Sequence, residues 1–398
     1  MANHIILIYT ERCFMKNGEK QNCQKSLEDT LIEVCGIFGI PGTYCGYEQV
    51  VMGNINTTYK VTYRRDDGST KSYIVQKVNM YVFRKPRQIM SNIDLVTTYL
   101  KQKNADAGIT DTRSFMHFYH THTGKRQNFY VDYDHAFWRI SKYIENTITF
   151  NVCDSLFAIE EAGRAFGKFQ CNLSDFDAQK LYETIPDFHN TKKRMVDFMR
   201  HVVEDSCDRV DSVMSEVEYL VSVGERASKL TEMLERGELP LRVTHNDTKI
   251  NNVLFDKDTE RALVVIDLDT VMPGLVAHDF GDAVRFAANT AAEDERDTSK
   301  ISFDLEKYTA FAKGFIPEVR DALTENEVDT LALGAFTMTV ELATRFLDDY
   351  ITGDNYFKTH YAGHNMVRAK SQIALARDIQ RKYGKMRQIV KDVYDGKN

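Results

Sequence analysis

The sequence contains 398 residues, 43% of them hydrophobic and 27% charged, with a formal net charge of −7. This length predicts two sizeable cores rather than one domain, and the composition is ordinary for a globular protein. The acidic balance excludes broad binding to nucleic acid or anionic membranes, and no apolar run approaches the length of a membrane span. Seven cysteines without a C-x-x-C pair are typical of reduced thiols. We therefore expect a cytoplasmic protein with no nucleic-acid or membrane partner, present as a monomer or a weak homodimer.

The first part of the chain predicts a β-rich lobe over residues 27–145, after a poorly determined tail at residues 1–26. Apolar residues recur at helical spacing from Ser26 to Phe38. Alternating and β-branched runs then predict strands at 47–52, 58–63, 71–78, 129–133 and 137–142. A helix is expected at 88–102, between the third and fourth of these strands.

The remainder, residues 146–398, predicts a mostly helical lobe. Helical periodicity is found at residues 155–171, 190–204, 208–236, 304–314, 318–350 and 364–394. Two short strands are expected at 242–244 and 262–266. The polar segment between these two strands carries the most informative motif of the chain.

This motif reads H-x-D-x-K-x-x-N over His245–Asn252 and is followed, after an apolar strand, by Asp267. These residue types in this order suit phosphoryl transfer. We assign Asp247 as the base that binds and deprotonates an acceptor hydroxyl, and Lys249 as the cation that offsets charge on the moving phosphoryl group. Asn252 and Asp267 are hard oxygen ligands of the kind that Mg²⁺ prefers beside ATP. The pattern is therefore a kinase signature, although a polar turn with the same residue types is the structural alternative.

Several neighbouring residues have open roles. His245 is interpreted as a hydrogen-bond partner that orders the loop rather than as a catalyst. Asp269 is either a second metal ligand or an anchor for the loop.

The segment Asp279-Phe280-Gly281 imitates the D-F-G letters of protein kinases, but Asp267 already occupies the metal position after the strand. We interpret 278–282 as the start of a helix that fixes the catalytic loop, with Asp279 or Asp282 accepting hydrogen bonds from backbone donors. Arg285 either supports this network or reaches a phosphate.

The loop at residues 53–58 lies where kinases cover the nucleotide phosphates, although it has one glycine rather than three. Its backbone N–H groups, with the hydroxyls of Thr57 and Thr58, are candidate phosphate ligands. Asn54 or Asn56 is expected to face the acceptor. An ordinary hairpin turn is the alternative for this loop taken alone.

Two further segments belong to the expected ATP site. On the strand at 71–78, Lys77 supplies the charge for the α- and β-phosphates, but a one-residue slip would put Gln76 there instead. Asp94 is the nearest acidic partner in the following helix. The backbone of Tyr143 and Ile144, at the junction of the lobes, is expected to pair with adenine.

The chain resembles the aminoglycoside-phosphotransferase and choline-kinase-like family of small-molecule kinases from about residue 30 to the C-terminus. Six segments carry the resemblance: 53–59, 162–167, 241–252, 266–274, 279–282 and the helical stretch from Arg345 to Tyr356. The resemblance implies an α+β, two-lobed protein-kinase-like fold with a nucleotide-binding first lobe and the acceptor pocket in the second. It also implies ATP and Mg²⁺ as cofactors.

Within that family the resemblance implies a sugar acceptor, an N-acetylhexosamine phosphorylated at its anomeric hydroxyl. Arg345 and Tyr356 would then line the sugar pocket, although from the sequence alone they suit a solvated charge and a packing aromatic. Asn54 replaces a histidine of the related kinase, so sugar preference or affinity is expected to differ. A kinase for choline, homoserine, methylthioribose or an aminoglycoside remains the alternative, and a nucleotide-binding protein without catalysis is a second.

Overall fold

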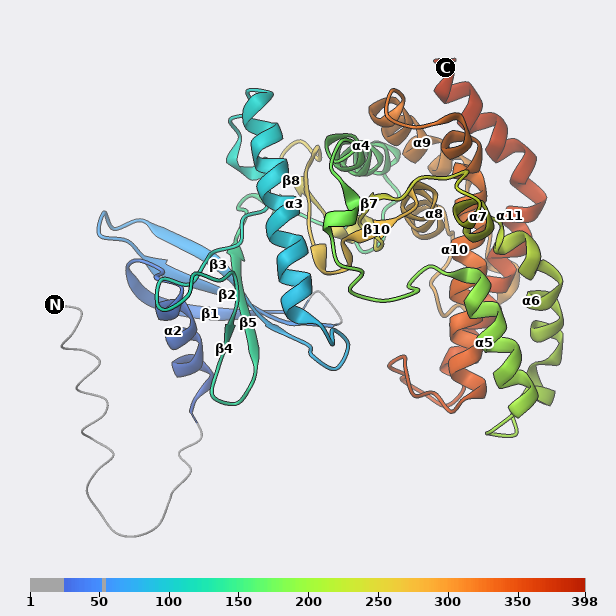
Figure 1. Ribbon diagram of the computed structural model, residues 1–398, viewed down its shortest axis with the longest axis horizontal. Coiled ribbons are helices and arrows are strands. Elements are labelled where there is room, and N and C mark those ends of the chain that lie inside the picture. Colours follow the sequence, from blue (N-terminus) through green and yellow to red (C-terminus); the bar gives the residue numbers. More distant parts are fainter. Residues whose placement is uncertain (1–24, 52–54, 398) are drawn as a thin grey trace, which may run out of the picture.

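The computed structural model describes residues 25–51 and 55–397, and these residues form two lobes (Figure 1). A β-rich lobe is built from the N-terminal part of the chain, and a mostly helical lobe follows it. The two-lobed α+β organisation predicted from the sequence is confirmed. No helix in the described part of the chain is long and apolar enough to span a membrane.

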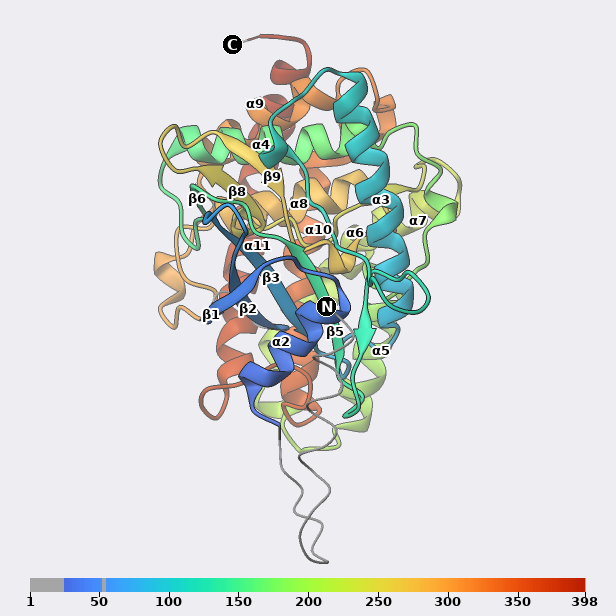
Figure 2. The ribbon, with the colours of Figure 1, turned by 90° about the vertical axis from the view of Figure 1, so that its left-hand side faces the viewer.

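The first lobe is a five-stranded antiparallel sheet with the strand order β1-β2-β3-β5-β4. Its strands are β1 (Thr43–Val50), β2 (Thr57–Arg64), β3 (Thr70–Val78), β4 (Tyr130–Val131) and β5 (Phe137–Lys142). Helix α2 (Leu27–Ile37) covers the outer face of this sheet, which is the near face in Figure 2. The contact is apolar: Leu31 and Val34 of α2 are buried with Val61, Val75 and Ile140 of the sheet.

Helix α3 (Pro86–Asp106) stands between the sheet and the helical lobe (Figure 1). It begins with Pro86, whose fixed φ suits the first turn of a helix. Its buried face, including Ile89, Ile93 and Val96, belongs to the same apolar core as the second lobe. The two lobes therefore share a packed contact along α3.

The second lobe is built around long helices. They are α4 (Leu156–Asn172), α5 (Thr191–Glu204), α6 (Met214–Ala227), α7 (Lys229–Glu235), α8 (Val276–Ala287), α9 (Leu305–Val319), α10 (Glu325–Ile351) and α11 (His364–Tyr394). Short strands β6 (Thr147–Ile148), β8 (Val253–Asp256) and β9 (Ala262–Val265) form one sheet, and β7 (Arg242–Thr244) pairs with β10 (Met272–Gly274). The short 3₁₀ helices are η1 (Thr112–Ser114), η2 (Ala178–Lys180), η3 (Val210–Val213), η4 (Ile250–Asn252), η5 (Leu268–Thr270) and η6 (Thr298–Lys300).

Helices α8 and α10 approach each other unusually closely, through two glycines. A Cβ atom added to Gly281 would collide with the backbone of Gly334, and one added to Gly334 would collide with the backbone of Ala277. Such contact holds α8 in a fixed position against the central helix of the lobe. The position of α8 matters because Asp279, on its first turn, contacts the catalytic loop.

Three details differ from the sequence prediction. The predicted break between helices at 315–317 is wrong, since α9 continues to Val319 with Pro317 in its last turns. The break comes later, where Thr324 and Glu327 form a capping box that starts α10. The region 208–236 is not one helix but η3, α6 and α7. The short strands β6, β8 and β10 were not predicted.

Candidate active site

The loop between β7 and η4 brings three of the predicted site residues together. The ammonium Nζ of Lys249 lies 2.8 Å from Oδ1 of Asp247. The amide Nδ2 of Asn252 donates to Oδ2 of Asp247 at 3.1 Å and to its backbone oxygen at 2.9 Å. The side chains of Asp247 and Lys249 are 29% and 36% exposed, so a substrate can reach both.

The charges of this pair stabilise each other. Burial opposes ionisation of Asp247, but the Lys249 ammonium and the hydrogen bond from Asn252 outweigh it and lower the pKa of this carboxyl. The negative charge of Asp247, against an opposing effect of burial, raises the pKa of Lys249. Asp247 is therefore an ionised carboxylate and Lys249 a cation at neutral pH, as general-base and charge-stabilising roles require.

His245 orders the loop through both ring nitrogens. Nδ1 accepts the backbone N–H of Asp247 at 3.3 Å, and Nε2 donates to the backbone oxygen of Ile266 at 2.9 Å. The ring is fully buried and lies edge-on to Phe166 and Phe169. The interpretation of His245 as a loop-ordering residue is thus confirmed.

Asp279 fixes the same loop from helix α8. Its carboxylate accepts the backbone N–H groups of His245 at 2.8 Å and Asn246 at 2.7 Å, and the side-chain amide of Gln170 at 2.6 Å. Asn246 has φ of +62°, a left-handed conformation that these bonds stabilise. The predicted role of the segment 278–282 in fixing the loop is confirmed, with Asp279 as the residue that performs it.

Asp282 and Arg285 lie one turn further along α8. The guanidinium of Arg285 donates to Oδ1 of Asp282 at 2.7 and 3.1 Å, and both residues are buried. The negative charge of Asp282 also contributes to the raised pKa of Lys249. Arg285 therefore supports the network beneath the catalytic loop.

Asp267 lies two residues after strand β9, and the backbone brings it beside Asn252. The N–H of Ile266 donates to the backbone oxygen of Asn252 at 2.8 Å, so the two predicted metal ligands occupy neighbouring positions. Asp267 has φ of +59°, which turns its side chain out of the strand direction. Partial desolvation by the surrounding protein, followed by the negative charges of Asp269 and Asp247, raises the pKa of Asp267 to about 7.

These residues fit a magnesium ion held together with a nucleotide. Among residues 25–51 and 55–397, no three His, Cys, Asp or Glu side chains form a cluster that would hold a metal alone. Magnesium in kinases does not need one, because nucleotide phosphates and water supply most of its ligands. Asn252 and Asp267 offer hard oxygen donors, and Asp267 lies near the carboxylates of Asp269 and Asp247, whose negative charges a divalent cation would offset.

The strand β3 decides between the two candidates for the phosphate-facing position. Gln76 donates to Oγ1 of Thr58 at 3.1 Å, on the face of the sheet turned toward the second lobe. Lys77 points to the other face, where it is exposed and lies over the ring of Trp138. Asp94, the acidic partner considered for Lys77, pairs instead with His120 at 3.2 Å. Strand β3 therefore brings an amide, not a lysine, to the junction of the lobes.

The other predicted nucleotide contacts lie on the edges of the first lobe. Thr57 and Thr58 begin β2 and are half-buried. Tyr143 and Ile144 follow β5 directly, at the connection to the second lobe, and Ile144 is buried. Asn54, the predicted sugar contact of the loop, lies outside the described residues.

Arg139, on β5, is the residue of this site that the sequence analysis missed. Its guanidinium is 2% exposed and forms a two-pronged ion pair with Asp269, which is 3% exposed. Asp269 also accepts the amide of Asn56 at 2.7 Å, which makes it an anchor for the loop. A charged residue in the middle of the apolar strand 137–142 was the available signal, since a buried arginine requires a partner.

Arg345 and Tyr356, predicted to line the acceptor pocket, contact each other beside two further aromatic rings. Nη2 of Arg345 lies 3.4 Å from the hydroxyl of Tyr356. The guanidinium lies 5.3–5.7 Å from the ring centres of Phe188, Tyr356 and Phe357. Tyr356 remains 66% exposed, so this face is open to solvent.

A buried polar cluster connects that face to helix α8. Glu341, one turn before Arg345 on α10, accepts Nδ1 of His189 at 2.9 Å and the hydroxyl of Thr191 at 2.8 Å. The ring of His189 lies 5.1 Å from that of His278, the neighbour of Asp279. Burial raises the pKa of Glu341, but the charges of His189 and Arg194 outweigh burial and leave this pKa well below its usual range. Arg345 is therefore one layer of side chains from the segment that fixes the catalytic loop.

This cluster predicts a loss of stability in mild acid. Burial, and then the nearby His189, lower the pKa of His278 to about 3 from an ordinary 6.5. Between these values the unfolded chain binds a proton that the folded chain refuses, so stability falls as pH decreases below 6.5. We expect the free energy of unfolding to be lower by about 2 kcal/mol at pH 5 because of this residue. Urea unfolding at pH 6.5 and pH 5 measures the change in the free energy of unfolding. In His278→Gln, the number of protons taken up on unfolding should be lower by about one, so this change should be smaller. An unchanged dependence in that variant would contradict the assignment.

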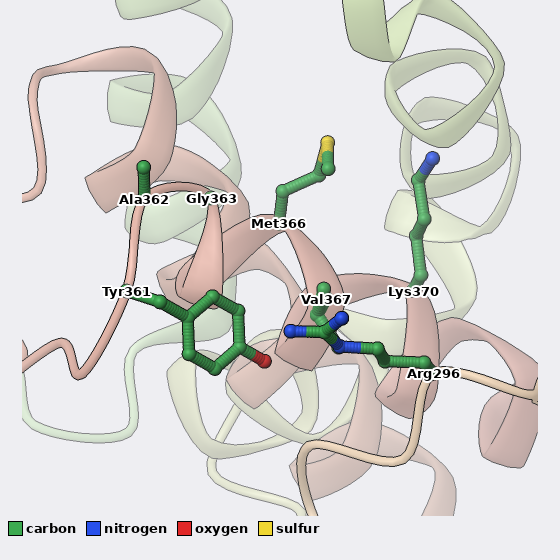
Figure 3. Close-up of a pocket in the computed structure, with 7 residues that line it drawn as sticks. All are labelled: Arg296, Tyr361, Ala362, Gly363, Met366, Val367 and Lys370. Carbon is green, nitrogen blue, oxygen red and sulfur yellow. The ribbon is translucent and has the colours of Figure 1, made fainter.

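A surface cavity of about 350 Å³ lies at the start of α11 (Figure 3). It is lined by Arg296, Tyr361, Ala362, Gly363, Met366, Val367 and Lys370. None of these residues belongs to the candidate active site, and the guanidinium of Arg296 stacks on the ring of Tyr361 at 4.7 Å. The cavity therefore contributes nothing to the chemistry described above.

Comparison with known protein families identifies the segment that carries the motif. Residues 130–311 match the model described as "Phosphotransferase enzyme family". This segment runs from β4 to α9 and contains the catalytic loop, Asp267 and the segment 278–282.

Solved structures share the fold at low sequence identity. An ethanolamine kinase of Plasmodium vivax is 13% identical, with a TM-score of 0.52 over 93% of this chain and 94% of its own. An aminoglycoside phosphotransferase of Alicyclobacillus acidocaldarius is 13% identical, with a TM-score of 0.56 over 94% and 99%. A microcompartment-associated aminopropanol kinase is 14% identical, with a TM-score of 0.57 over 89% and 98%. The chain thus has the two-lobed kinase-like fold of these structures, and its segment 130–311 matches the model of the phosphotransferase enzyme family.

Proposed function

We propose that this protein transfers the γ-phosphoryl group of ATP, with Mg²⁺, to the anomeric hydroxyl of an N-acetylhexosamine and so forms the sugar 1-phosphate. One observation carries the proposal: a base, a cation and two oxygen ligands converge at the junction of the lobes. These are Asp247, Lys249, Asn252 and Asp267. The convergence supports phosphoryl transfer, and the resemblance in sequence supports the sugar acceptor.

The proposed reaction follows from the charges of these residues. Asp247 accepts the proton of the anomeric hydroxyl while the oxygen of that hydroxyl forms a bond to the γ-phosphorus. The bond from that phosphorus to the bridging β,γ-oxygen breaks, and ADP leaves with the electron pair. Lys249 offsets the charge on the phosphoryl oxygens. Bound Mg²⁺ would neutralise charge on the nucleotide phosphates, with Asn252 and Asp267 as its protein ligands.

The chief alternative acceptor is an amino alcohol, since structural relatives are named as ethanolamine and aminopropanol kinases. A cationic acceptor would call for aromatic faces or carboxylates that are free to receive an ammonium group. On the acceptor side of this protein, Phe188, Tyr356 and Phe357 already surround the guanidinium of Arg345. A fixed cation repels an ammonium but donates well to hydroxyl and acetamido oxygens, which favours the sugar.

Replacement of Arg345 by alanine should raise KM for the sugar about 10-fold or more, because a hydrogen bond from a charged donor contributes roughly 1.5–3 kcal/mol. KM for ATP should stay unchanged. Arg377 provides a matched control, since its guanidinium lies 4.2 Å from the ring of Tyr219 on an exposed surface. Steady-state kinetics of Arg345→Ala and Arg377→Ala make the comparison. Equal effects of the two changes would remove Arg345 from the acceptor site.

The proposal is tested by measuring acceptor-dependent ADP release across N-acetylhexosamines, amino alcohols and aminoglycosides. We expect release with N-acetylglucosamine or N-acetylgalactosamine and little with choline or ethanolamine. Preferred turnover of an amino alcohol would establish the alternative. Absence of release with every acceptor would leave phosphoryl transfer itself without support.

A further inference from the structure

The junction of the lobes contains a polar network that the proposed chemistry does not yet use. It consists of Asn56, Gln76, Arg139 and Asp269, and we call it the Arg139–Asp269 clamp. Three of these residues belong to the first lobe: Asn56 precedes β2, Gln76 is on β3 and Arg139 is on β5. Asp269 belongs to η5 in the second lobe, two residues after Asp267.

Each member of the clamp is held by another. Gln76 and Arg139 are direct neighbours across the β3–β5 pair, and Nε of Arg139 donates to Oε1 of Gln76 at 2.9 Å. Both terminal nitrogens of Arg139 donate to the two oxygens of Asp269. The amide of Asn56 donates to Asp269 at 2.7 Å, while its oxygen accepts the backbone N–H of Asn79 at 3.0 Å. The network therefore links the phosphate-covering loop to the segment that follows the metal carboxylate.

The clamp lies where other kinases have a lysine paired with an acidic residue. Kinases place a lysine on the third strand, paired with an acidic residue, and this pair must form for the nucleotide to be aligned. Here Gln76 occupies the inward position of β3 and Lys77 points away, so the inward cation is supplied one strand over by Arg139. Its partner is not on helix α3 but on the metal-binding segment itself.

Energetics also argue against a purely stabilising role. Arg139 and Asp269 are both almost fully buried, and transfer of such charges from water costs several kcal/mol, which their attraction offsets only in part. In other proteins, replacement of a buried ion pair by apolar residues of similar volume is often neutral or stabilising. A fully hydrogen-bonded buried network does, however, restrict the positions of the segments that it joins.

We propose that Arg139 and Asp269 are positioning residues that hold the metal carboxylate Asp267 and Asn56, directly before β2, in register for Mg²⁺–nucleotide binding. This inference rests on the proposed function, because it assumes that a magnesium nucleotide binds at Asp267. The clamp acts through Asp267 and Asn56 and does not itself touch the phosphates, since its guanidinium already donates to Asp269 and Gln76.

The test measures binding without turnover. The affinity for adenylyl imidodiphosphate, a non-hydrolysable ATP analogue, is measured by calorimetry with Mg²⁺ and again with EDTA. In Arg139→Lys and Asp269→Asn we expect the affinity with Mg²⁺ to fall about 10–100-fold, the range found when a group that orients a metal ligand is changed. The affinity with EDTA should change much less. KM for the acceptor should stay unchanged in the same variants.

A matched control is available in the Arg113–Asp256 pair. It also joins the first lobe to the second, with an Nη1–Oδ2 distance of 2.6 Å, but it does not contact the metal-binding segment. Arg113→Lys should leave both affinities unchanged. In addition, the double variant Arg139→Lys/Asp269→Asn should bind the magnesium nucleotide no more weakly than either single variant, because each single change already breaks the same ion pair.

Each outcome has a clear meaning. If folded Arg139→Lys and Asp269→Asn bind the magnesium nucleotide as the unaltered protein does, the pair is only structural and the inference is overturned. Should both fail to fold, Asn56→Ala removes a single half-buried contact and must still weaken Mg²⁺-dependent binding; unchanged binding overturns the inference. If the unaltered protein itself binds no magnesium nucleotide, the proposed function fails, and the clamp with it.

Discussion

Replacement of Asp247 by asparagine should lower kcat by roughly two to four orders of magnitude, the usual contribution of a positioned general base. Asparagine keeps the size of the side chain and one oxygen, but it cannot take the acceptor proton. It also removes the charge that Lys249 faces at 2.8 Å and that the amide of Asn252 contacts at 3.1 Å. Steady-state kinetics at saturating ATP and acceptor measure the loss.

Two controls show that this loss is chemical. The melting temperature and the affinity for the magnesium nucleotide should change little in Asp247→Asn, because the backbone of the loop is held by Asp279 rather than by Asp247. A variant with nearly unaltered kcat would remove Asp247 from the role of base.

Replacement of Asp267 by asparagine should reduce kcat/KM for MgATP by at least about 100-fold, more than the loss of a residue that only supports a metal ligand. The cause differs from that in Asp247→Asn, since the carboxylate lost here is the expected charged ligand of the metal. The magnesium concentration needed for half-maximal activity should rise in parallel. Asp269→Asn is the internal comparison and should show the smaller effect. An unchanged magnesium requirement in Asp267→Asn would exclude this residue as a ligand.

The sequence predicted the parts of this protein that depend on local patterns. Alternation located β3 and β5, and helical periodicity located α4, α5 and α11 to within a few residues. The motif at 245–252 was readable because its residues are close in the chain, so one short loop is enough to bring Asp247, Lys249 and Asn252 together.

The parts that escaped prediction depend on contacts between distant residues. Arg139 and Asp269 are 130 positions apart, and they become partners only because the two lobes pack against each other in the fold. The choice between Gln76 and Lys77 depends on which face of β3 meets the second lobe, which alternation alone cannot assign. The start of α10 at the capping box of Thr324 and Glu327, rather than at residue 318, was also missed, although the residue types of this box are readable in the sequence.

The central claim, phosphorylation at an anomeric hydroxyl, is tested most directly by NMR of the reaction product. The protein is incubated with ATP, Mg²⁺ and N-acetylglucosamine or N-acetylgalactosamine, and phosphorus–proton couplings are recorded. We predict a phosphomonoester whose phosphorus couples to the proton on C1. A phosphomonoester coupled instead to the protons on C6, or sugar recovered without phosphate, would contradict the account.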